Sequence, residues 1–267
     1  MGQQGHGPSA DFDTYLARWR DWATSPWGRI RFSVVRQTLS WELDRLVGDG
    51  SARVLDVGGG DGRDAIPLAR RGHHVTILDP SPGMLADARA TAEQLGVEDR
   101  VSTVEGSLDE DLREWTDGGY DLVLCHFVLQ YRSPGPADLR RMAGALRPGG
   151  RLSVIAPNPV GTVLSRLVRG GPEAALAELE RPASESVTFQ HEVRKISYDE
   201  MREDLVEAGL DVVAQYGGRC ANDILTDDEA KHRPEYFTRL EELELALCDR
   251  EPYKRIGLFW QLVAERR

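Results

Sequence analysis

Residues 53–62 read RVLDVGGGDG, and this stretch decides the fold that we predict for the chain. Val54 to Val57 form a short apolar run of the kind that becomes a buried strand. The glycines that follow let the backbone turn sharply and approach a ligand more closely than a Cβ atom would allow. The stretch therefore predicts a strand followed by a ligand-binding loop, with a nucleotide-like cofactor as the ligand.

The spacing of the glycines distinguishes two kinds of cofactor. A dinucleotide-binding loop has the pattern Gly-x-Gly-x-x-Gly, but the last position counted from Gly58 is Arg63. The weaker variant with Gly60, Gly62 and Ala65 remains. Because the chain also lacks a Tyr-x-x-x-Lys pair, a nicotinamide-dependent oxidoreductase is kept as a distant alternative.

Asp79 is the second part of the cofactor signature. It ends the run HHVTILD (residues 73–79) and follows Gly62 by 17 residues. Its two carboxylate oxygens can accept hydrogen bonds from both hydroxyls of a ribose. The pairing of the glycine loop with this aspartate indicates a nucleoside-binding site at the carboxyl ends of two strands.

Strands and helices alternate along the chain, which predicts an α/β, Rossmann-like fold with helices on both faces of a mostly parallel sheet. Two helices, separated by a turn at residues 25–28, precede the first strand. We expect a disordered N-terminus over residues 1–10 and a single domain over 11–267, with a helical cap at 11–50. The predicted strands cover residues 54–57, 73–79, 101–106, 120–125, 151–157, 210–218 and 256–265.

Residues 160–195 interrupt this alternation with an amphipathic helix and a polar stretch. An insert at this point can act as a lid over the ligand or form a solvated surface excursion, and the sequence leaves both open.

Composition excludes several classes of protein. The chain has 44 acidic and 33 basic residues and a net charge of −11, which repels polyanions at long range. Cys125, Cys220 and Cys248 are far apart and form no Cys-x-x-Cys, so we predict buried thiols and no metal site. The chain has neither a signal-like segment nor an apolar run of membrane-spanning length, so we expect a cytoplasmic protein without a membrane partner. The sequence leaves the oligomeric state open.

The pattern Asp56-x-Gly58-x-Gly60-x-Gly62, together with Asp79, resembles the first motif of class I S-adenosylmethionine-dependent methyltransferases. This resemblance implies S-adenosylmethionine as the cofactor and a seven-stranded sheet whose last strand is antiparallel. Three stretches resemble the bacterial tRNA 5-carboxymethoxyuridine carboxyl-methyltransferases: residues 27–46, 54–85 and 240–257. The first and third lie outside the shared cofactor core.

The resemblance also implies roles for individual residues. By position, Arg31 would meet the methionine carboxylate, Leu108 and Asp109 the adenine, and His126 the region of the sulfonium. Arg219, in the stretch YGGRC, falls where that family has an arginine near its acceptor, and Tyr131 is a second expected acceptor contact. The complete expected cofactor set is Arg31, Asp56, Gly58, Gly59, Gly60, Asp79, Pro80, Met84, Leu108, Asp109 and His126.

Methyl transfer from a sulfonium is an in-line displacement, so the protein must mainly align the reactants and exclude water. A carboxylate acceptor, with an ordinary pKa of about 4, is already ionised at neutral pH and needs no general base. His126 is the candidate catalytic residue; it can act as a base or as a hydrogen-bonding group that packs against the cofactor. Arg219 can hold an acceptor carboxylate or be a surface charge. The sequence leaves both pairs of alternatives open.

Two acceptors fit this chemistry. The first hypothesis is a small biosynthetic acid, because the chain is acidic and reads ERPASESV at residues 180–187, where relatives carry a lysine-rich run. The alternative is a carboxymethoxyuridine at the tRNA wobble position. Wobble bases lie in a single-stranded loop and are read through stacking and edge contacts, so an acidic protein remains compatible with tRNA.

Overall fold

The computed structural model describes residues 16–109, 119–185 and 192–267, so the disordered N-terminus predicted for residues 1–10 lies outside it. The strands are β1 Arg53–Val57, β2 His74–Asp79, β3 Val101–Glu105, β4 Tyr120–His126, β5 Leu146–Pro157, β6 Ala183–Glu185, β7 Glu192–Arg194, β8 Leu210–Gly218 and β9 Phe259–Arg266. The α-helices are α2 Leu16–Thr24, α3 Pro26–Val47, α4 Ile66–Ala69, α5 Pro82–Gln94, α6 Ala137–Ala145, α7 Pro159–Glu180, α8 Tyr198–Glu207 and α9 Pro234–Leu247. Short 3₁₀ helices are η1 Glu98–Arg100, η3 Leu129–Tyr131, η4 Ala230–His232 and η5 Tyr253–Arg255.

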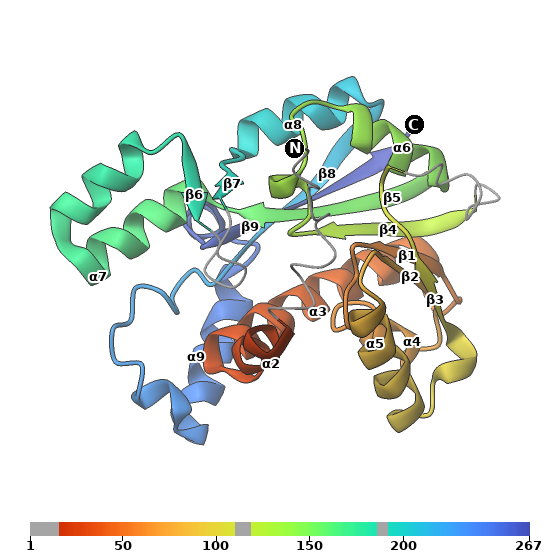
Figure 1. Ribbon diagram of the computed structural model, residues 1–267, viewed down its shortest axis with the longest axis horizontal. Helices are drawn as coiled ribbons and strands as arrows, with labels where there is room; N and C mark the ends of the chain where they lie inside the picture. Colours follow the sequence, from red (N-terminus) through yellow and green to blue (C-terminus); the bar gives the residue numbers. More distant parts are fainter. Residues whose placement is uncertain (1–15, 110–118, 186–191) are drawn as a thin grey trace, which may run out of the picture.

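The central sheet has seven strands in the order β3-β2-β1-β4-β5-β9-β8 (Figure 1). The five strands from β3 to β5 pair in parallel, and β9 is antiparallel to both β5 and β8. The predicted seven-stranded, mostly parallel sheet with an antiparallel last strand is therefore confirmed. The strand order reverses between β1 and β4, and in open α/β sheets ligands bind at the carboxyl ends of such strands.

Two apolar cores cover the two faces of the sheet (Figure 1). Along β1 and β4 successive side chains alternate between the cores, as the period of a strand requires. One core packs the sheet against α6 and α8, through Leu139, Met142, Met201 and Leu205. The other packs it against α3, α4, α5 and α9, through Ile30, Leu39, Ile66, Leu85, Phe237 and Leu240.

The N-terminal cap differs from the prediction at its turn. Ser25 caps α3 by accepting a hydrogen bond from the Gly28 N–H at 3.1 Å, and Pro26 is already the first helical residue. Proline fits this position because the first helical N–H groups need no partner within the helix. A Cβ at Gly28 would lie 2.3 Å from the Trp22 carbonyl oxygen, so glycine is needed where α2 packs against α3. The turn predicted over residues 25–28 is therefore wrong beyond Ser25.

The insert forms a broken helix and a small hairpin. Asn158 caps α7, and Gly171 interrupts it with φ 78° and ψ −176°, just before Pro172. The two halves of α7 fold back on each other in Figure 1, and the antiparallel pair β6–β7 follows. The lid over residues 160–195 stays a prediction.

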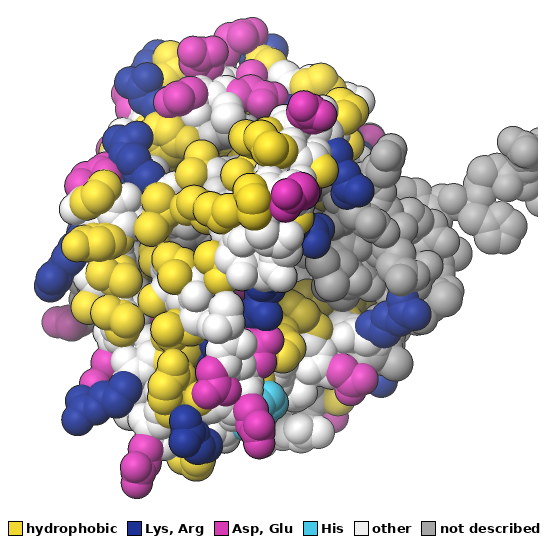
Figure 2. All heavy atoms as spheres, turned by 90° about the vertical axis from the view of Figure 1, so that its left-hand side faces the viewer, with side chains coloured by type: hydrophobic (Ala, Val, Ile, Leu, Met, Phe, Trp, Pro, Cys, Tyr) yellow, Lys and Arg dark blue, Asp and Glu magenta, His cyan; other side chains and the backbone are white. Residues whose placement is uncertain are grey.

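The helical hairpin of α7 exposes apolar side chains, and Figure 2 shows hydrophobic groups gathered over the face that contains it. Val160, Leu176 and Leu179 are more than half exposed. Among the described helices, none combines the length and the apolar character that crossing a bilayer requires.

The cysteines are buried, as predicted. Cys125, Cys220 and Cys248 are all free thiols, and burial raises the pKa of each one. Within the described ranges, no group of histidine, cysteine and acidic side chains is arranged to hold a metal ion.

Candidate functional site

The glycine loop begins at the end of β1. Gly58, Gly60 and Gly62 have φ values of 68°, 55° and 75°, in the left-handed region that favours glycine. A Cβ at Gly59 would lie 2.6 Å from Asp56 Oδ2, so the loop packs directly on that buried carboxyl group. At Gly60 the nearest atom to such a Cβ, Met84 Sδ, is 3.8 Å away. The loop therefore presents open backbone at Gly60.

Asp79 joins this loop to the end of β2. Its Oδ2 accepts a hydrogen bond from the Gly60 N–H at 2.9 Å, and its Oδ1 accepts one from the Ser81 N–H at 2.9 Å. The carboxylate therefore holds the glycine loop and the start of α5 together at the carboxyl end of β2. Pro80 connects Asp79 to Ser81, which caps α5 through the Met84 N–H. The structure thus brings together the predicted residues from Gly58 to Met84.

Arg31, Asp64 and His126 form a buried charged cluster beside the loop. Both terminal nitrogens of Arg31 donate to the Asp64 carboxylate, and His126 Nδ1 lies 2.8 Å from Asp64 Oδ2. The exposed fractions of the three residues are 4%, 9% and 8%. Arg31 Nε is buried without a hydrogen-bond partner, so the guanidinium keeps a free donor. The sequence analysis missed Asp64, whose signal is an acidic residue two positions after Gly62.

A row of polar contacts extends from His126 across the sheet. His126 Nε2 lies 2.9 Å from Ser153 Oγ on β5, and Gln261 Nε2 on β9 donates to the same hydroxyl at 2.9 Å. Thr38 Oγ1 on α3 completes the row by donating to Gln261 Oε1 at 2.7 Å. Both ring nitrogens of His126 are therefore engaged with protein groups, and its orientation is fixed.

The electrostatics of the cluster follow from its burial. Burial alone would raise the pKa of Asp64, but the charge of Arg31 and the hydrogen bond with His126 outweigh it and leave this pKa below its usual value. Burial lowers the pKa of His126, against the opposing effect of Asp64. Burial and the neighbouring Asp64 charge raise the pKa of Asp56. The cluster therefore holds a charged Arg31–Asp64 pair beside a neutral imidazole at pH 7.

The residues predicted for the adenine end lie after β3. Leu108 is buried, and the side chain of Asp109 is exposed and paired with Arg132 through bonds of 2.9 and 2.7 Å. Arg132 also binds Asp138 on α6, at 2.9 Å. Tyr131 is partly buried and ends η3, directly after β4. The structure therefore joins Asp109 to the segment that carries Tyr131.

Arg219 follows β8 at the same edge of the sheet as His126, because β8 runs in the direction of β5. It has a φ of 58°, and its side chain is 12% exposed. Its guanidinium donates to Asp223 Oδ2 at 2.8 Å and to Asp223 Oδ1 at 2.6 Å. Arg219 is therefore largely buried and oriented by an ion pair, and its role toward an acceptor stays a prediction.

Aromatic rings connect Arg219 with the Arg31 cluster. The Phe127 ring lies 5.1 Å from the Arg31 guanidinium carbon and 5.7 Å from the Phe259 ring. A Cβ at Gly218 would lie 2.0 Å from Phe259 Cζ, so the backbone next to Arg219 packs on that ring. Sequence reasoning could not find these contacts, because the four segments are distant in the chain.

Comparison with known proteins identifies the family. A family model of the methyltransferase domain matches residues 54–150. The tRNA 5-carboxymethoxyuridine methyltransferase of Escherichia coli K12 is 31% identical over 243 residues, which are 87% of this chain and 88% of that protein. The ubiquinone biosynthesis O-methyltransferase of Acinetobacter baylyi is 30% identical over 75% of this chain and 80% of that protein.

A solved structure shows the same fold. It is the magnesium protoporphyrin IX methyltransferase of Synechocystis with bound S-adenosylhomocysteine, which superimposes with a TM-score of 0.63 at 19% identity and covers 97% of this chain and 98% of that chain. The resemblance noted in the sequence is thus confirmed, and the chain belongs to the class I S-adenosylmethionine-dependent methyltransferases.

Proposed function

We propose that this methyltransferase esterifies a carboxylate, and that the carboxylate belongs to a carboxymethoxyuridine in the anticodon loop of tRNA. The similarity to the tRNA-modifying relative supports this acceptor, because it covers 87% of the chain whereas the methyltransferase-domain model covers residues 54–150. The similarity therefore extends to segments outside the cofactor core. In ranking tRNA first, we reverse the order that composition alone favours.

The residues around the glycine loop fit the cofactor. Gly60 leaves space that a Cβ would begin to fill, Asp79 Oδ2 borders that space, and Arg31 Nε is a buried donor without a partner. We assign the cofactor carboxylate to Arg31 and the ribose to Asp79, with Leu108 and Asp109 at the adenine end. When bound, S-adenosylmethionine supplies a methyl group on a positively charged sulfur. The protein contributes alignment and exclusion of water.

The observation that carries the acceptor assignment is the placement of Arg219. Its partly buried guanidinium lies at the ligand edge and uses two of its five N–H groups on Asp223, which leaves donors for a second carboxylate. Asp223 fixes the plane of the guanidinium, so an acceptor carboxylate can be held in one orientation. This chemistry needs no general base, in keeping with a neutral His126 whose two nitrogens are engaged.

A small biosynthetic acid is the second candidate. The net charge of −11 and the similarity to the ubiquinone biosynthesis O-methyltransferase favour it. The same Arg219 would hold its carboxylate. With a methyltransferase assigned, the nicotinamide-dependent oxidoreductase alternative has no remaining support.

A fractionation experiment separates the two acceptors. The enzyme is incubated with methyl-labelled cofactor, total tRNA and a small-molecule extract, and the label is measured in each fraction. We expect label in tRNA, and loss of about 100-fold in rate for Arg219→Ala, because a bidentate charged hydrogen bond is removed. Arg70→Ala, which changes an exposed arginine at the C-terminal end of α4, is the control. Label in the small-molecule fraction alone would replace the first candidate by the second.

A further inference from the structure

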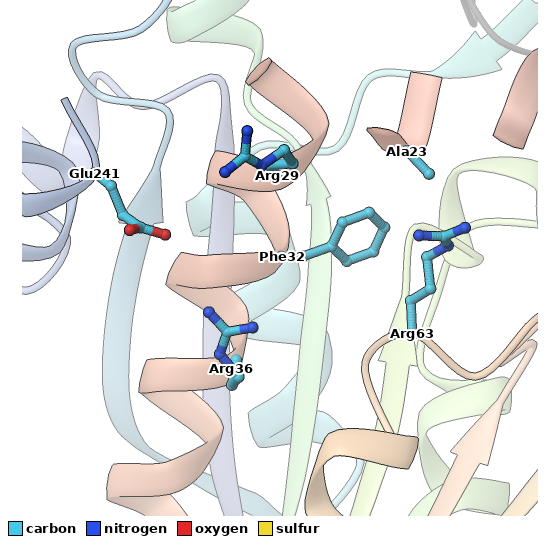
Figure 3. Close-up of a pocket in the computed structure, with 6 residues that line it drawn as sticks. All are labelled: Ala23, Arg29, Phe32, Arg36, Arg63 and Glu241. Atoms are coloured by element: carbon cyan, nitrogen blue, oxygen red, sulfur yellow. The ribbon is translucent and has the colours of Figure 1, made fainter. Parts of the chain in front are cut away.

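A cavity of about 370 Å³ lies beside the glycine loop and outside the site assigned to the cofactor (Figure 3). Its lining comes from α2, α3, α9 and the residue after Gly62, and consists of Ala23, Arg29, Phe32, Arg36, Arg63 and Glu241. In Figure 3 the Phe32 ring points from α3 toward Arg63, and Arg29 and Arg36 project from the same helix. Three guanidinium groups thus line one concave surface.

The cavity is locally positive in an acidic protein. Its lining has three arginines and one glutamate; Arg63 Nε is paired with Asp61 Oδ2 at 2.7 Å, which leaves Arg29 and Arg36 against Glu241 in a chain of net charge −11. Within the part of the chain that the structure describes, neither Arg29 nor Arg36 forms an ion pair with a carboxylate. Arg29 lies 3.8 Å from the centre of the Phe237 ring, and Arg36 makes one long contact of 3.4 Å with Ser33 Oγ. Both guanidinium groups therefore retain donors for an anion.

Phosphate is the anion that this arrangement fits best. Guanidinium groups bind phosphate oxygens through paired N–H bonds, and a cavity of this size accommodates a phosphate with an attached sugar. The Phe32 ring adds an apolar wall against which such a sugar or base can pack. A carboxylate alone would fill little of this volume.

The cavity borders elements that also carry residues assigned to the cofactor and to the acceptor. The Phe32 ring lies 4.5 Å from the Arg31 guanidinium carbon and 5.7 Å from that of Arg63, so it separates the cavity from the cofactor residues by one side chain. On the other side, α9 contributes Glu241 to the cavity and Glu244 to the loop that carries Arg219. One helix therefore borders both the cavity and the loop that carries Arg219.

We propose that this cavity binds a phosphate group of the methyl acceptor. The inference rests on the proposed function, in which that phosphate is a phosphodiester of tRNA near the modified nucleotide. Local contacts of this kind allow an acidic protein to hold RNA without an extended basic surface. A nucleoside monophosphate would offer the same chemistry from a small molecule.

The test compares two double variants. The first, Arg29→Gln/Arg36→Gln, removes two arginines of the cavity, and the control, Arg70→Gln/Arg250→Gln, removes two exposed arginines elsewhere. Binding of tRNA is measured by fluorescence anisotropy between 50 and 200 mM salt, and binding of uridine monophosphate and inorganic phosphate by calorimetry. We expect the first variant to bind tRNA at least 10-fold more weakly, with a salt dependence reduced by about 1.4 in log–log slope for two lost contacts. The affinity of the control variant for tRNA, and the affinity of both variants for S-adenosylhomocysteine, should change less than 2-fold. Arg36→Glu alone should weaken tRNA binding further than Arg36→Gln.

The outcomes separate this inference from the proposed function. If tRNA is methylated and both double variants bind it like the wild type, the phosphate cavity is refuted and the function stands. If tRNA is neither bound nor methylated but uridine monophosphate binding requires Arg29 and Arg36, the cavity stands and the tRNA acceptor is refuted. A 10-fold loss of S-adenosylhomocysteine affinity in the first variant would instead make the cavity part of the cofactor site.

Discussion

At the scale of single residues, the carboxylate of Asp79 holds the glycine loop in place while it faces the ligand edge. The Gly60 and Ser81 N–H groups both donate to it, so its removal would loosen the loop in addition to the loss of ligand contacts that we predict. The sequence predicted the ligand role of Asp79 from its spacing, whereas its role in the loop depends on backbone geometry that spacing does not encode.

Asp79→Ala should therefore weaken the binding of S-adenosylhomocysteine by on the order of 2–4 kcal/mol, because two charge-assisted hydrogen bonds are lost. Isothermal titration calorimetry measures the effect, with Asp99→Ala, an exposed carboxylate in η1, as the control. An unchanged dissociation constant would show that Asp79 does not contact the cofactor.

The buried imidazole of His126 should make the stability of the protein depend on pH. Its pKa is lowered in the folded state, so the unfolded chain takes up the proton first as the pH falls below about 6.5. Stability should fall from there until the lower folded pKa is reached. His126→Gln removes this proton uptake. The slope of the free energy of unfolding against pH should then be shallower by up to about 1.4 kcal/mol per pH unit.

Urea unfolding at pH 7.5, 6.5 and 5.5 measures this difference, and His74→Gln, which removes an exposed histidine from β2, is the control. Equal slopes for the wild type and His126→Gln would contradict the neutral, buried imidazole.

The sequence predicted only part of the cluster of Arg31, Asp64 and His126. The resemblance placed Arg31 and His126 individually, but Asp64 joins them only once α3, the loop and β4 are packed together. The contact between Thr38 and Gln261 spans 223 positions, and no local pattern can indicate such a pairing.

At the scale of elements, α9 organises the loop after β8. The buried Glu244 carboxylate accepts hydrogen bonds from the N–H groups of Cys220, Ala221 and Asn222 at 2.7, 3.0 and 2.7 Å. These bonds fix the backbone directly after Arg219, which itself adopts a left-handed conformation. The helix therefore fixes the backbone beside Arg219, and the ion pair with Asp223 orients its guanidinium.

Glu244→Gln should disturb this loop, because an amide offers one acceptor oxygen where the carboxylate offers two. We expect a loss of about 1–3 kcal/mol in the free energy of unfolding and a larger increase in KM for the acceptor than in the dissociation constant of S-adenosylhomocysteine. Glu242→Gln, on the exposed side of the same helix, is the control. Parallel changes in acceptor and cofactor binding would argue against a specific link to Arg219.

Helix boundaries were predictable where the local chemistry is distinctive. Ser81 and Pro82 indicated the start of α5, and the structure confirms both the cap and the first position. Ser25 and Pro26 offer the same signal, but Gly28 suggested a longer turn because its packing against Trp22 cannot be seen in the sequence. The break in α7 has a readable signal in Gly171 and Pro172, which the helical periodicity of its apolar residues concealed.

At the scale of the whole molecule, the alternation of strands and helices determines the sheet order, and the sheet brings the ligand groups to one edge. Gly58 and Arg219 follow β1 and β8, and His126 ends β4; the carboxyl ends of these three strands lie on the same side. The net charge of −11 describes the average surface and not this edge, where Arg29, Arg36 and Arg63 gather around one cavity. Composition alone could not reveal this local reversal of charge.

The central claim is that the protein forms a methyl ester on a carboxylate of tRNA. Mild alkali cleaves methyl esters and leaves N-methyl and ether methyl groups intact, so the most direct measurement is the alkali lability of label transferred from S-adenosylmethionine to tRNA. The account predicts that wild-type enzyme labels tRNA, that mild alkali releases the label as methanol, and that Arg219→Ala transfers about 100-fold less. Alkali-stable label in tRNA, or no label in tRNA from an enzyme that binds S-adenosylhomocysteine, would contradict it.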